Sequence, residues 1–396
     1  MKHIIVLCDG MSDDPAGGAT VMAKAYKPHM DFFASRGMTG RARTIPDGLP
    51  AGSDVANLTV LGYDASRCYT GRSPLEAASL GLTLENGDWA YRCNLVTLSD
   101  HERYQDRVML DYGAGDVTPE EAAGLMAALQ DGIGDGRVTF HPGSAYRHCM
   151  IMKNGADPGD TVGPHDISGQ AIGPHLNAHL AALQERGAEI LKGRRSGNAI
   201  WLWGQGTKPA LEPFEAKYGM RGAVISAVDL LRGIGRLTGM ETVIVPGATG
   251  YLDTCFEAKT QAALDALAGG CGVAYLHFEA PDECAHRGEA EGKVQAIELI
   301  DARCLAILRR ELPKLGGHRI LILPDHATPL SLRTHSRHPV PFLLYDSREK
   351  HPPLRGHPLL RKRVEGCFDE TSVAHCEPID GLNLMTMLLG RRTGGG

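Results

Sequence analysis

The stretch that decides the fold is residues 319–341, which read RILILPDHATPLSLRTHSRHPVP. It begins with a short apolar run at residues 320–323, which a proline ends. A short apolar run bounded by a breaker is typical of a buried strand in a parallel sheet. Asp325 and His326 follow at once, and His335 comes later in the stretch. A carboxylate and an imidazole at a strand end are good ligands for a divalent cation, although an Asp–His surface turn has the same local pattern.

The composition is that of a globular protein with two domains. The chain has 396 residues, of which 43% are hydrophobic and 22% charged, and this length exceeds that of one ordinary domain. The net charge of −6 gives no sign of a nucleic-acid surface, and no apolar run approaches membrane-spanning length. The ten cysteines are dispersed and no signal peptide is recognised, so we expect reduced thiols and a cytoplasmic location.

Strands that alternate with helices predict a doubly wound, mostly parallel α/β sheet. We expect strands of this sheet at residues 3–7, 198–203, 223–226, 241–246, 272–280 and 320–323, and helices at residues 28–36, 226–239, 256–268 and 293–310. Residues 86–194 contain strands and helices but no ligand-like strand ends. We interpret them as an inserted α+β domain, with residues 1–85 and 195–396 forming the core domain.

Within the insert, local signals predict three further elements. Thr118 is expected to cap a helix that has Pro119 at its first position and that ends near residue 130. Residues 137–152 are typical of a hairpin or strand pair, and residues 175–191 of a long helix.

Three apolar strands of the core end in carboxylates, namely Asp9, Asp282 and Asp325. Open α/β sheets bind ligands outside the carboxyl ends of their strands, so these three side chains can meet in one place. His286 comes four residues after Asp282, which puts both on one face of a helix. With the histidines at 326 and 335, these ligands are enough for two metal sites and suit Mn²⁺, Zn²⁺, Co²⁺ or Mg²⁺.

Ser53 opens a predicted helix after a loop rich in proline and glycine. A serine at this point is ordinarily an N-cap. However, a helix N-terminus also stabilises a phosphate through its free amide groups and its dipole. Because two neighbouring metals typically clamp a phosphoryl group, Ser53 is also a candidate for a metal-activated nucleophile.

Several motifs occur together along the chain. They are D-G at 9–10, G-S-D-V-A-N-L at 52–58, P-D-E-x-x-H-x-G at 281–288, P-D-H at 324–326 and T-H-x-x-x-P-V-P at 334–341. This set resembles the alkaline phosphatase superfamily, and within it the archaeal-type, 2,3-bisphosphoglycerate-independent phosphoglycerate mutases. The resemblance runs over nearly the whole chain and includes phrases such as YTGRSPLEA at 69–77 and VPGATGYLD at 245–253. It implies an alkaline-phosphatase-like fold.

The resemblance also implies two metal sites, with Mn²⁺ expected before Zn²⁺, Co²⁺ or Mg²⁺. One metal would be held by Asp282, His286 and His335, and the other by Asp9, Asp325, His326 and the oxygen of Ser53. Ser53 would be the nucleophile and would carry the phosphoryl group as phosphoserine. The family pattern usually has Asp or Asn at the position of His338, so His338 is a further residue that could compete as a ligand or lie behind the ligands.

Phosphoglycerate carries a carboxylate and a phosphate, so cationic side chains must converge on it. By motif context the candidates are Arg72, Arg92, Arg147, His148, His165 and Lys208. We expect Arg72 and Lys208 to act in catalysis, with Lys208 offsetting charge on the substrate hydroxyl as the phosphate arrives. Taken singly, each of the six is about as well explained by a surface ion pair.

The activity implied by the resemblance is the interconversion of 3-phosphoglycerate and 2-phosphoglycerate through a phosphoserine, without 2,3-bisphosphoglycerate, in glycolysis or gluconeogenesis. A phosphomonoesterase, or a phosphotransferase with another acceptor such as homoserine, would use the same metal chemistry. A third alternative is a metal-stabilised binding protein without catalysis. The expected partner is the small-molecule substrate, and no feature of the sequence predicts an oligomeric state.

Overall fold

The computed structural model describes residues 1–15, 18–115, 117–349 and 367–391. They form two compact units, which we call the core unit (Met1–Tyr69 with Ala210–Gly396) and the inserted unit (Thr70–Pro209). The inserted unit is wider than the predicted 86–194. It also contains α5 (Ser73–Ser79) and β7 (Ala199–Thr207), because α5 packs on the sheet of this unit and β7 pairs with its longest strand.

The core unit is built on an eight-stranded sheet with the order β13-β2-β12-β11-β1-β10-β8-β9. Its strands are β1 (Lys2–Cys8), β2 (Met38–Arg43), β8 (Gly222–Ile225), β9 (Glu241–Val243), β10 (Val273–Phe278), β11 (His318–Leu323), β12 (Val340–Asp346) and β13 (Ile379–Asp380). All neighbouring pairs are parallel except those that β12 makes with β11 and β2. The predicted α/β class with a mostly parallel sheet is confirmed.

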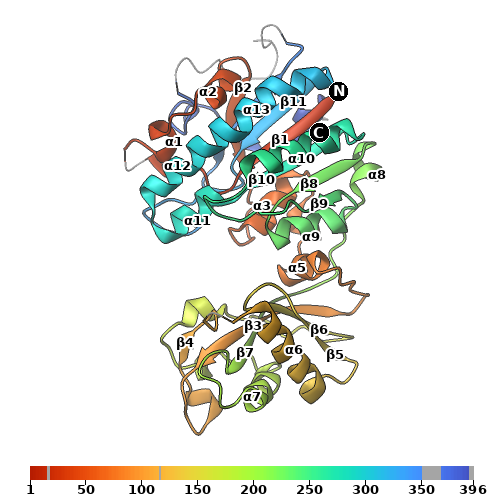
Figure 1. Ribbon diagram of the computed structural model, residues 1–396, viewed down its shortest axis with the longest axis vertical. Coiled ribbons are helices and arrows are strands. Elements are labelled where there is room, and N and C mark those ends of the chain that lie inside the picture. The colour runs from red at the N-terminus through yellow and green to blue at the C-terminus, as the bar shows by residue number, and fades with distance from the viewer. Residues whose placement is uncertain (16–17, 116, 350–366, 392–396) are drawn as a thin grey trace. The chain divides into compact units, whose positions relative to one another are not determined.

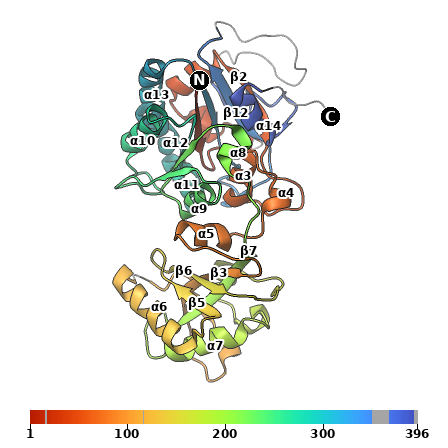
Figure 2. The same cartoon turned by 90° about the vertical axis from the view of Figure 1, so that its right-hand side faces the viewer.

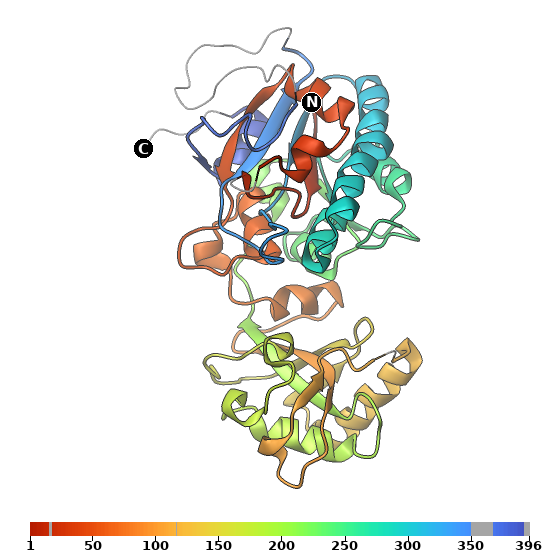
Figure 3. The same ribbon diagram turned by 90° about the vertical axis from the view of Figure 1, so that its left-hand side faces the viewer.

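Helices cover both faces of this sheet, which explains why its central strands are continuous apolar runs. One face carries α1 (Val21–Lys24), α2 (Pro28–Ala34), α10 (Phe256–Ala268), α12 (Ala290–Ile300) and α13 (Ala306–Glu311), with a π-helical segment, Asp301–Leu305, joining the last two (Figures 1 and 3). The opposite face carries α3 (Ser53–Val60), α8 (Phe214–Tyr218), α9 (Asp229–Leu237) and α14 (Asn383–Leu389) (Figure 2). Two further short helices are α4 (Ala65–Cys68) and α11 (Ala280–Arg287).

The inserted unit has its own five-stranded sheet with α6 (Pro119–Ile133) and α7 (Ala181–Ile190) on one face and α5 on the other (Figure 1). Its strands besides β7 are β3 (Trp89–Leu98), β4 (Met109–Asp111), β5 (Val138–His141) and β6 (Arg147–Met152). The predicted strand pair is confirmed, since β5 and β6 are antiparallel neighbours. The predicted cap is also confirmed, because the Thr118 side chain accepts a hydrogen bond from the Glu121 amide.

Two predictions on this unit are wrong. The strand expected at 198–203 in the core sheet is β7, which runs antiparallel to β3 in the inserted unit. The helix expected at 175–191 begins only at Ala181. The Asn177 side chain explains the late start, because it donates hydrogen bonds to the carbonyls of Pro158 and Asp160 and holds its own segment in a loop. Within the described ranges, no helix combines the length and apolarity that crossing a membrane requires.

We expect the core beneath α10 to be sensitive to the loss of a single side chain. Leu267 is fully buried in the cluster between α10 and the sheet, so Leu267→Ala should lower the free energy of unfolding by about 2–5 kcal/mol. Gln261→Ala, on the exposed side of the same helix, should change it by less than about 0.5 kcal/mol. Urea denaturation measures both, and equal effects would contradict this description of the core.

Candidate metal centre

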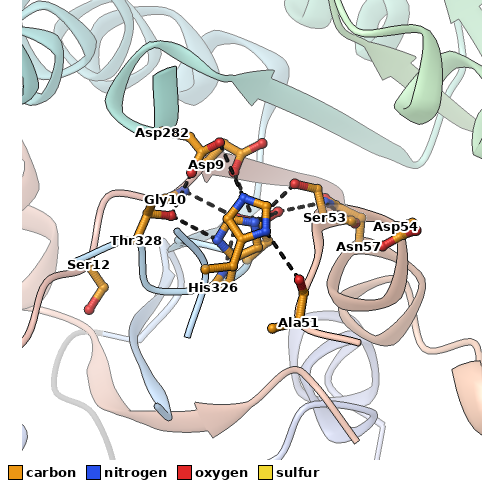
Figure 4. A network of polar contacts seen from close by, with 12 residues as sticks. Asp9, Gly10, Ser12, Ala51, Ser53, Asp54, Asn57, Asp282, His326 and Thr328 are labelled. Atoms are coloured by element: carbon orange, nitrogen blue, oxygen red, sulfur yellow. Dashed lines mark hydrogen bonds and ion pairs between the residues drawn. The ribbon is translucent and has the colours of Figure 1, made fainter. Parts of the chain in front are cut away.

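The central strands of the core sheet bring three carboxylates to one edge. Asp9 directly follows β1, Asp325 follows β11, and Asp282 lies in the first turn of α11, which begins just after β10. Because β11, β1 and β10 are adjacent and parallel, the three side chains lie close together, and Figure 4 shows Asp9 beside Asp282. All three are buried, and none is more than 5% exposed.

Asp282, His286 and His335 form what we call the first ligand group. The Nε2 atom of His286 lies 3.1 Å from Asp282 Oδ2, and the Nε2 atom of His335 lies 3.6 Å from the same oxygen. The two Nε2 atoms are 3.0 Å apart. Asp282 and His286 come from one face of α11, as their spacing predicts, and His335 reaches them from the loop that precedes β12.

Asp9, Ser53, Asp325 and His326 form the second ligand group. The Nε2 atom of His326 lies 3.0 Å from Ser53 Oγ and 3.5 Å from both Asp9 Oδ1 and Asp325 Oδ2. Asp9 Oδ1 is buried and has no hydrogen-bond partner. The two groups adjoin, because ligand atoms of Asp282, His326 and His335 also lie within 4.8 Å of one another.

The hydrogen bonds of the imidazole rings favour metal binding. His286 Nδ1 lies 3.0 Å from the Arg333 carbonyl oxygen and His335 Nδ1 lies 3.2 Å from that of Ala51. A carbonyl oxygen only accepts, so each Nδ1 carries a proton and each Nε2 is directed at the other Nε2 and at Asp282 Oδ2. A proton shared among these atoms relieves their repulsion in the metal-free protein, and a divalent cation would take its place. The residues present therefore fit divalent metal ions.

The pKa values of these groups reflect the proximity of several ionisable side chains in one buried site. Burial, together with the charges of Asp325 and Asp282, raises the pKa of Asp9 well above its usual range. Burial opposes ionisation of Asp282 too, but hydrogen bonds with His286 and His335 hold its pKa well below the usual range. The hydrogen bond with Asp282 in turn raises the pKa of His286 to about 9. Several negative charges thus compete within one buried site, and bound cations would offset them.

Ser53 is the first residue of α3, and Gly52 is its N-cap, so the N-cap interpretation of Ser53 is wrong. The hydroxyl faces His326 instead (Figure 4). One turn later, Asn57 donates hydrogen bonds to the Ser53 carbonyl at 2.7 Å and to Asp325 Oδ2 at 2.8 Å. Asn57 therefore fixes the start of α3 against the second ligand group, a role that the sequence analysis missed.

His277 was missed as well. Its Nε2 atom lies 2.9 Å from Asp9 Oδ2, and burial lowers the pKa of His277 to about 3, so the ring is neutral and donates to Asp9. The sequence signal that could have identified His277 was the presence of a histidine near the end of the apolar strand β10. Its side chain points to the face opposite Leu276 because side chains alternate along a strand.

The cationic candidates lie in the inserted unit, where Glu76 joins two of them. Arg72 Nε lies 2.9 Å from Glu76 Oε1, and Arg92 Nε lies 3.5 Å from Glu76 Oε2, an ion pair too poorly directed for a hydrogen bond. Burial opposes ionisation of Glu76, but the charges of Arg92 and Arg72, and more weakly that of Arg147, lower its pKa. Three arginines thus lie near enough to one carboxylate for their charges to act on it.

The remaining candidates are placed differently. His165 packs edge-on against Trp203, which also lies under the Arg92 guanidinium. His148 is buried on the opposite face of the sheet, since its strand partner belongs to the cluster beneath α6 and α7. Lys208 follows β7 and is exposed. In the core unit His338 is exposed and belongs to neither ligand group.

Comparison with known proteins places the chain in a family. A family model described as 2,3-bisphosphoglycerate-independent phosphoglycerate mutase matches residues 34–194. A probable enzyme of that name from Geobacter sulfurreducens is 45% identical and covers 99% of this chain and 100% of its own. The chain belongs to the 2,3-bisphosphoglycerate-independent phosphoglycerate mutase family. A second family member, from Methanothrix thermoacetophila, is 45% identical over 88% of this chain and 91% of its own.

Solved structures support the fold. The PH0037 protein from Pyrococcus horikoshii superimposes with a TM-score of 0.78 at 24% identity, covering 100% of this chain and 99% of its own. The cofactor-independent phosphoglycerate mutase from Thermoplasma acidophilum superimposes with a TM-score of 0.61 at 23% identity, covering 98% and 99%. The chain therefore shares its fold with these two proteins.

We expect Mn²⁺ to stabilise the metal-free protein, because a ligand that binds only the folded state adds about 2.7 kcal/mol at a hundred times its Kd. Asp325→Asn should reduce the rise in Tm, because it removes a charged ligand of the second group. Asp346→Asn is the matched control: Asp346 is also buried but pairs with Arg319 at the far end of the same strands. It should lower Tm yet keep the Mn²⁺-dependent rise. An undiminished rise in Asp325→Asn would refute the assignment.

Proposed function

We propose that the protein interconverts 3-phosphoglycerate and 2-phosphoglycerate through a phosphoserine on Ser53, without 2,3-bisphosphoglycerate. The observation that carries the proposal is the position of the Ser53 hydroxyl, 3.0 Å from His326 Nε2 and at the N-terminus of α3. There it adjoins two groups of metal-ligating residues and the free amides of a helix start. The family membership of the chain supports the substrate.

Two divalent ions, of which Mn²⁺ is our first expectation, would occupy the two ligand groups. Asp282, His286 and His335 would hold one, and Asp9, Asp325, His326 and Ser53 Oγ the other. When bound, such ions draw negative charge from the phosphoryl oxygens and favour the alkoxide form of a serine. Carboxylate oxygens suit Mn²⁺ and imidazole nitrogens suit Zn²⁺, so the donor set fits either ion and lacks the thiolate or thioether ligands that select Cu⁺.

Ser53 would act as nucleophile and then as leaving group. In the first step its Oγ forms a bond to phosphorus while the bond from phosphorus to the C3 oxygen of the substrate breaks. In the second step the oxygen on C2 of the same glycerate takes the phosphoryl group and the Ser53 oxygen is released. Asn57 keeps Ser53 in place through both steps, because its side chain bonds the Ser53 carbonyl and Asp325. No external phosphoryl donor is needed.

Arg72 and Arg92 would bind the anionic groups of the substrate. Glu76 orients the Arg72 guanidinium through a hydrogen bond and lies 3.5 Å from Arg92 Nε. Arg92 keeps a buried Nε without a hydrogen bond, and a carboxylate or phosphate can satisfy such a donor with high affinity. Arg147 and His165 are further candidates for substrate contact, and Lys208 for offsetting charge at the hydroxyl. The buried position of His148 favours a structural role.

We also infer a cytoplasmic location. All ten cysteines are free thiols, and eight of them are buried. Thiols in this state are typical of a reducing compartment such as the cytoplasm.

Ser53→Ala should abolish 2-phosphoglycerate formation from 3-phosphoglycerate, because it removes the proposed phosphoryl carrier and leaves only Asp9, Asp325 and His326, which would be engaged as metal ligands. Ser66→Ala is the matched control, since Ser66 lies in the first turn of the neighbouring helix α4 and is exposed; it should keep full activity. A coupled assay with added Mn²⁺ measures both. Full activity of Ser53→Ala would refute the phosphoserine and favour a role without covalent catalysis.

Arg92→Met should raise KM for 3-phosphoglycerate and lower kcat/KM by roughly 100-fold, since an ionic hydrogen bond to a charged ligand contributes about 1.5–3 kcal/mol. Arg103→Met, which removes an exposed arginine that pairs with Asp106 in the same unit, should leave both constants unchanged. If steady-state kinetics show equal, small effects for the two variants, Arg92 does not bind the substrate.

A further inference from the structure

We propose that Thr328 is a positioning residue that couples the two ligand groups, and that buried Lys293 holds Thr328 in place. The inference rests on the proposed function, because it assumes that both groups bind metal. It adds two residues that touch no substrate and no expected metal, and it explains how the two groups are kept in one arrangement.

The Thr328 hydroxyl bridges the two groups. It lies 2.5 Å from Asp282 Oδ1 of the first group and 3.2 Å from His326 Nδ1 of the second (Figure 4). A hydroxyl has one proton, and when Asp282 is ionised its carboxylate only accepts, so Thr328 donates to Asp282 and accepts from His326. His326 must then carry its proton on Nδ1, which leaves the Nε2 lone pair directed at Ser53 and Asp9.

The Thr328 hydroxyl is tightly packed by its neighbours. Thr328 is fully buried. Gly10 lies against it in the left-handed region, with φ of +60°, and a Cβ atom there would come within 2.7 Å of Thr328 Oγ1 and 2.4 Å of Asp282 Oδ1. Glycine at position 10 therefore lets the loop after β1 approach the Thr328–Asp282 hydrogen bond.

Lys293 fixes the backbone of Thr328. Its side chain is fully buried in α12, and Nζ donates hydrogen bonds to the carbonyls of Thr328 at 2.8 Å and Ser12 at 3.1 Å, with Asp13 Oδ2 3.7 Å away. The Thr328 amide also donates to the Ser12 carbonyl. An ammonium group buried among so few partners is costly to misplace. Lys293 thus ties the loop that follows Asp9 to the loop that follows His326.

This arrangement predicts that a change at Thr328 affects both metals. Without the hydroxyl, Asp282 loses a donor to its second oxygen, and His326 loses the acceptor that selects its tautomer. Partners behind metal ligands typically contribute 10–100-fold to metal affinity. A residue that supported one group alone would change one affinity only, so the number of sites affected distinguishes coupling from local support.

The test is calorimetric titration of metal-free protein with Mn²⁺ for the wild type, Thr328→Val and Thr328→Ser. Valine keeps the shape but not the hydroxyl, so Thr328→Val should weaken both binding events by roughly 10–100-fold. Thr328→Ser keeps the hydroxyl and should restore both affinities to near the wild-type values. Wild-type affinities in Thr328→Val, or weakening of one site only, would overturn the coupling. A wild type that binds no Mn²⁺ would instead overturn the proposed metal centre itself.

Lys293→Met provides a second route should Thr328→Val not fold. Its matched control is Lys27→Met, because Lys27 is also fully buried but pairs with Asp31 in α2, outside both ligand groups. Both variants should melt at lower temperature in the presence of a chelator. Only Lys293→Met should bind Mn²⁺ at both sites more weakly, and equal Mn²⁺ affinities in the two variants would contradict the role of Lys293.

Discussion

Mutual repulsion among Asp9, Asp282 and Asp325 is the constraint on which the rest of the core unit depends. Neighbouring parallel strands deliver these carboxylates to one buried edge, where like charges repel far more strongly than in water. The fold offsets part of this cost. Asp325 accepts hydrogen bonds from the amides of Gly10 and His326, and Asp9 from His277. Bound cations would offset the remaining negative charge. The strand arrangement that brings the carboxylates together therefore also forms the candidate metal centre.

The sequence predicted the core fold well because its strongest signals are local. Residues 256–268 form the predicted helix with the same bounds, and Asp282 and His286 lie on one face of α11 as their spacing indicates. The assignment of β7 to the core sheet was wrong because an apolar strand pattern does not indicate which other strand it pairs with. β7 belongs to the sheet of the inserted unit because it pairs with β3, which lies over a hundred residues away in the chain.

The candidate site was predictable where polar residues directly follow apolar strands, which holds for Asp9, Asp325 and His326, whereas His286 was predicted from its helical spacing to Asp282. Asn57, His277 and Thr328 were not recognised because each acts on another side chain that is distant in sequence. Thr328, for example, is defined by Asp282 and His326 together, and no spacing rule joins these three. In the inserted unit, both Arg92 and His148 were predicted from motif context, yet the alternation of side chains in β3 and β6 puts them on opposite faces.

The most direct test of the central claim is to incubate the purified protein with 3-phosphoglycerate and Mn²⁺ in the absence of 2,3-bisphosphoglycerate, and to follow 2-phosphoglycerate and inorganic phosphate together. The account predicts 2-phosphoglycerate with little free phosphate, loss of the activity in EDTA, and recovery when Mn²⁺ is restored. Release of inorganic phosphate at a rate that rivals 2-phosphoglycerate formation would contradict it and indicate a hydrolase built on the same ligand groups.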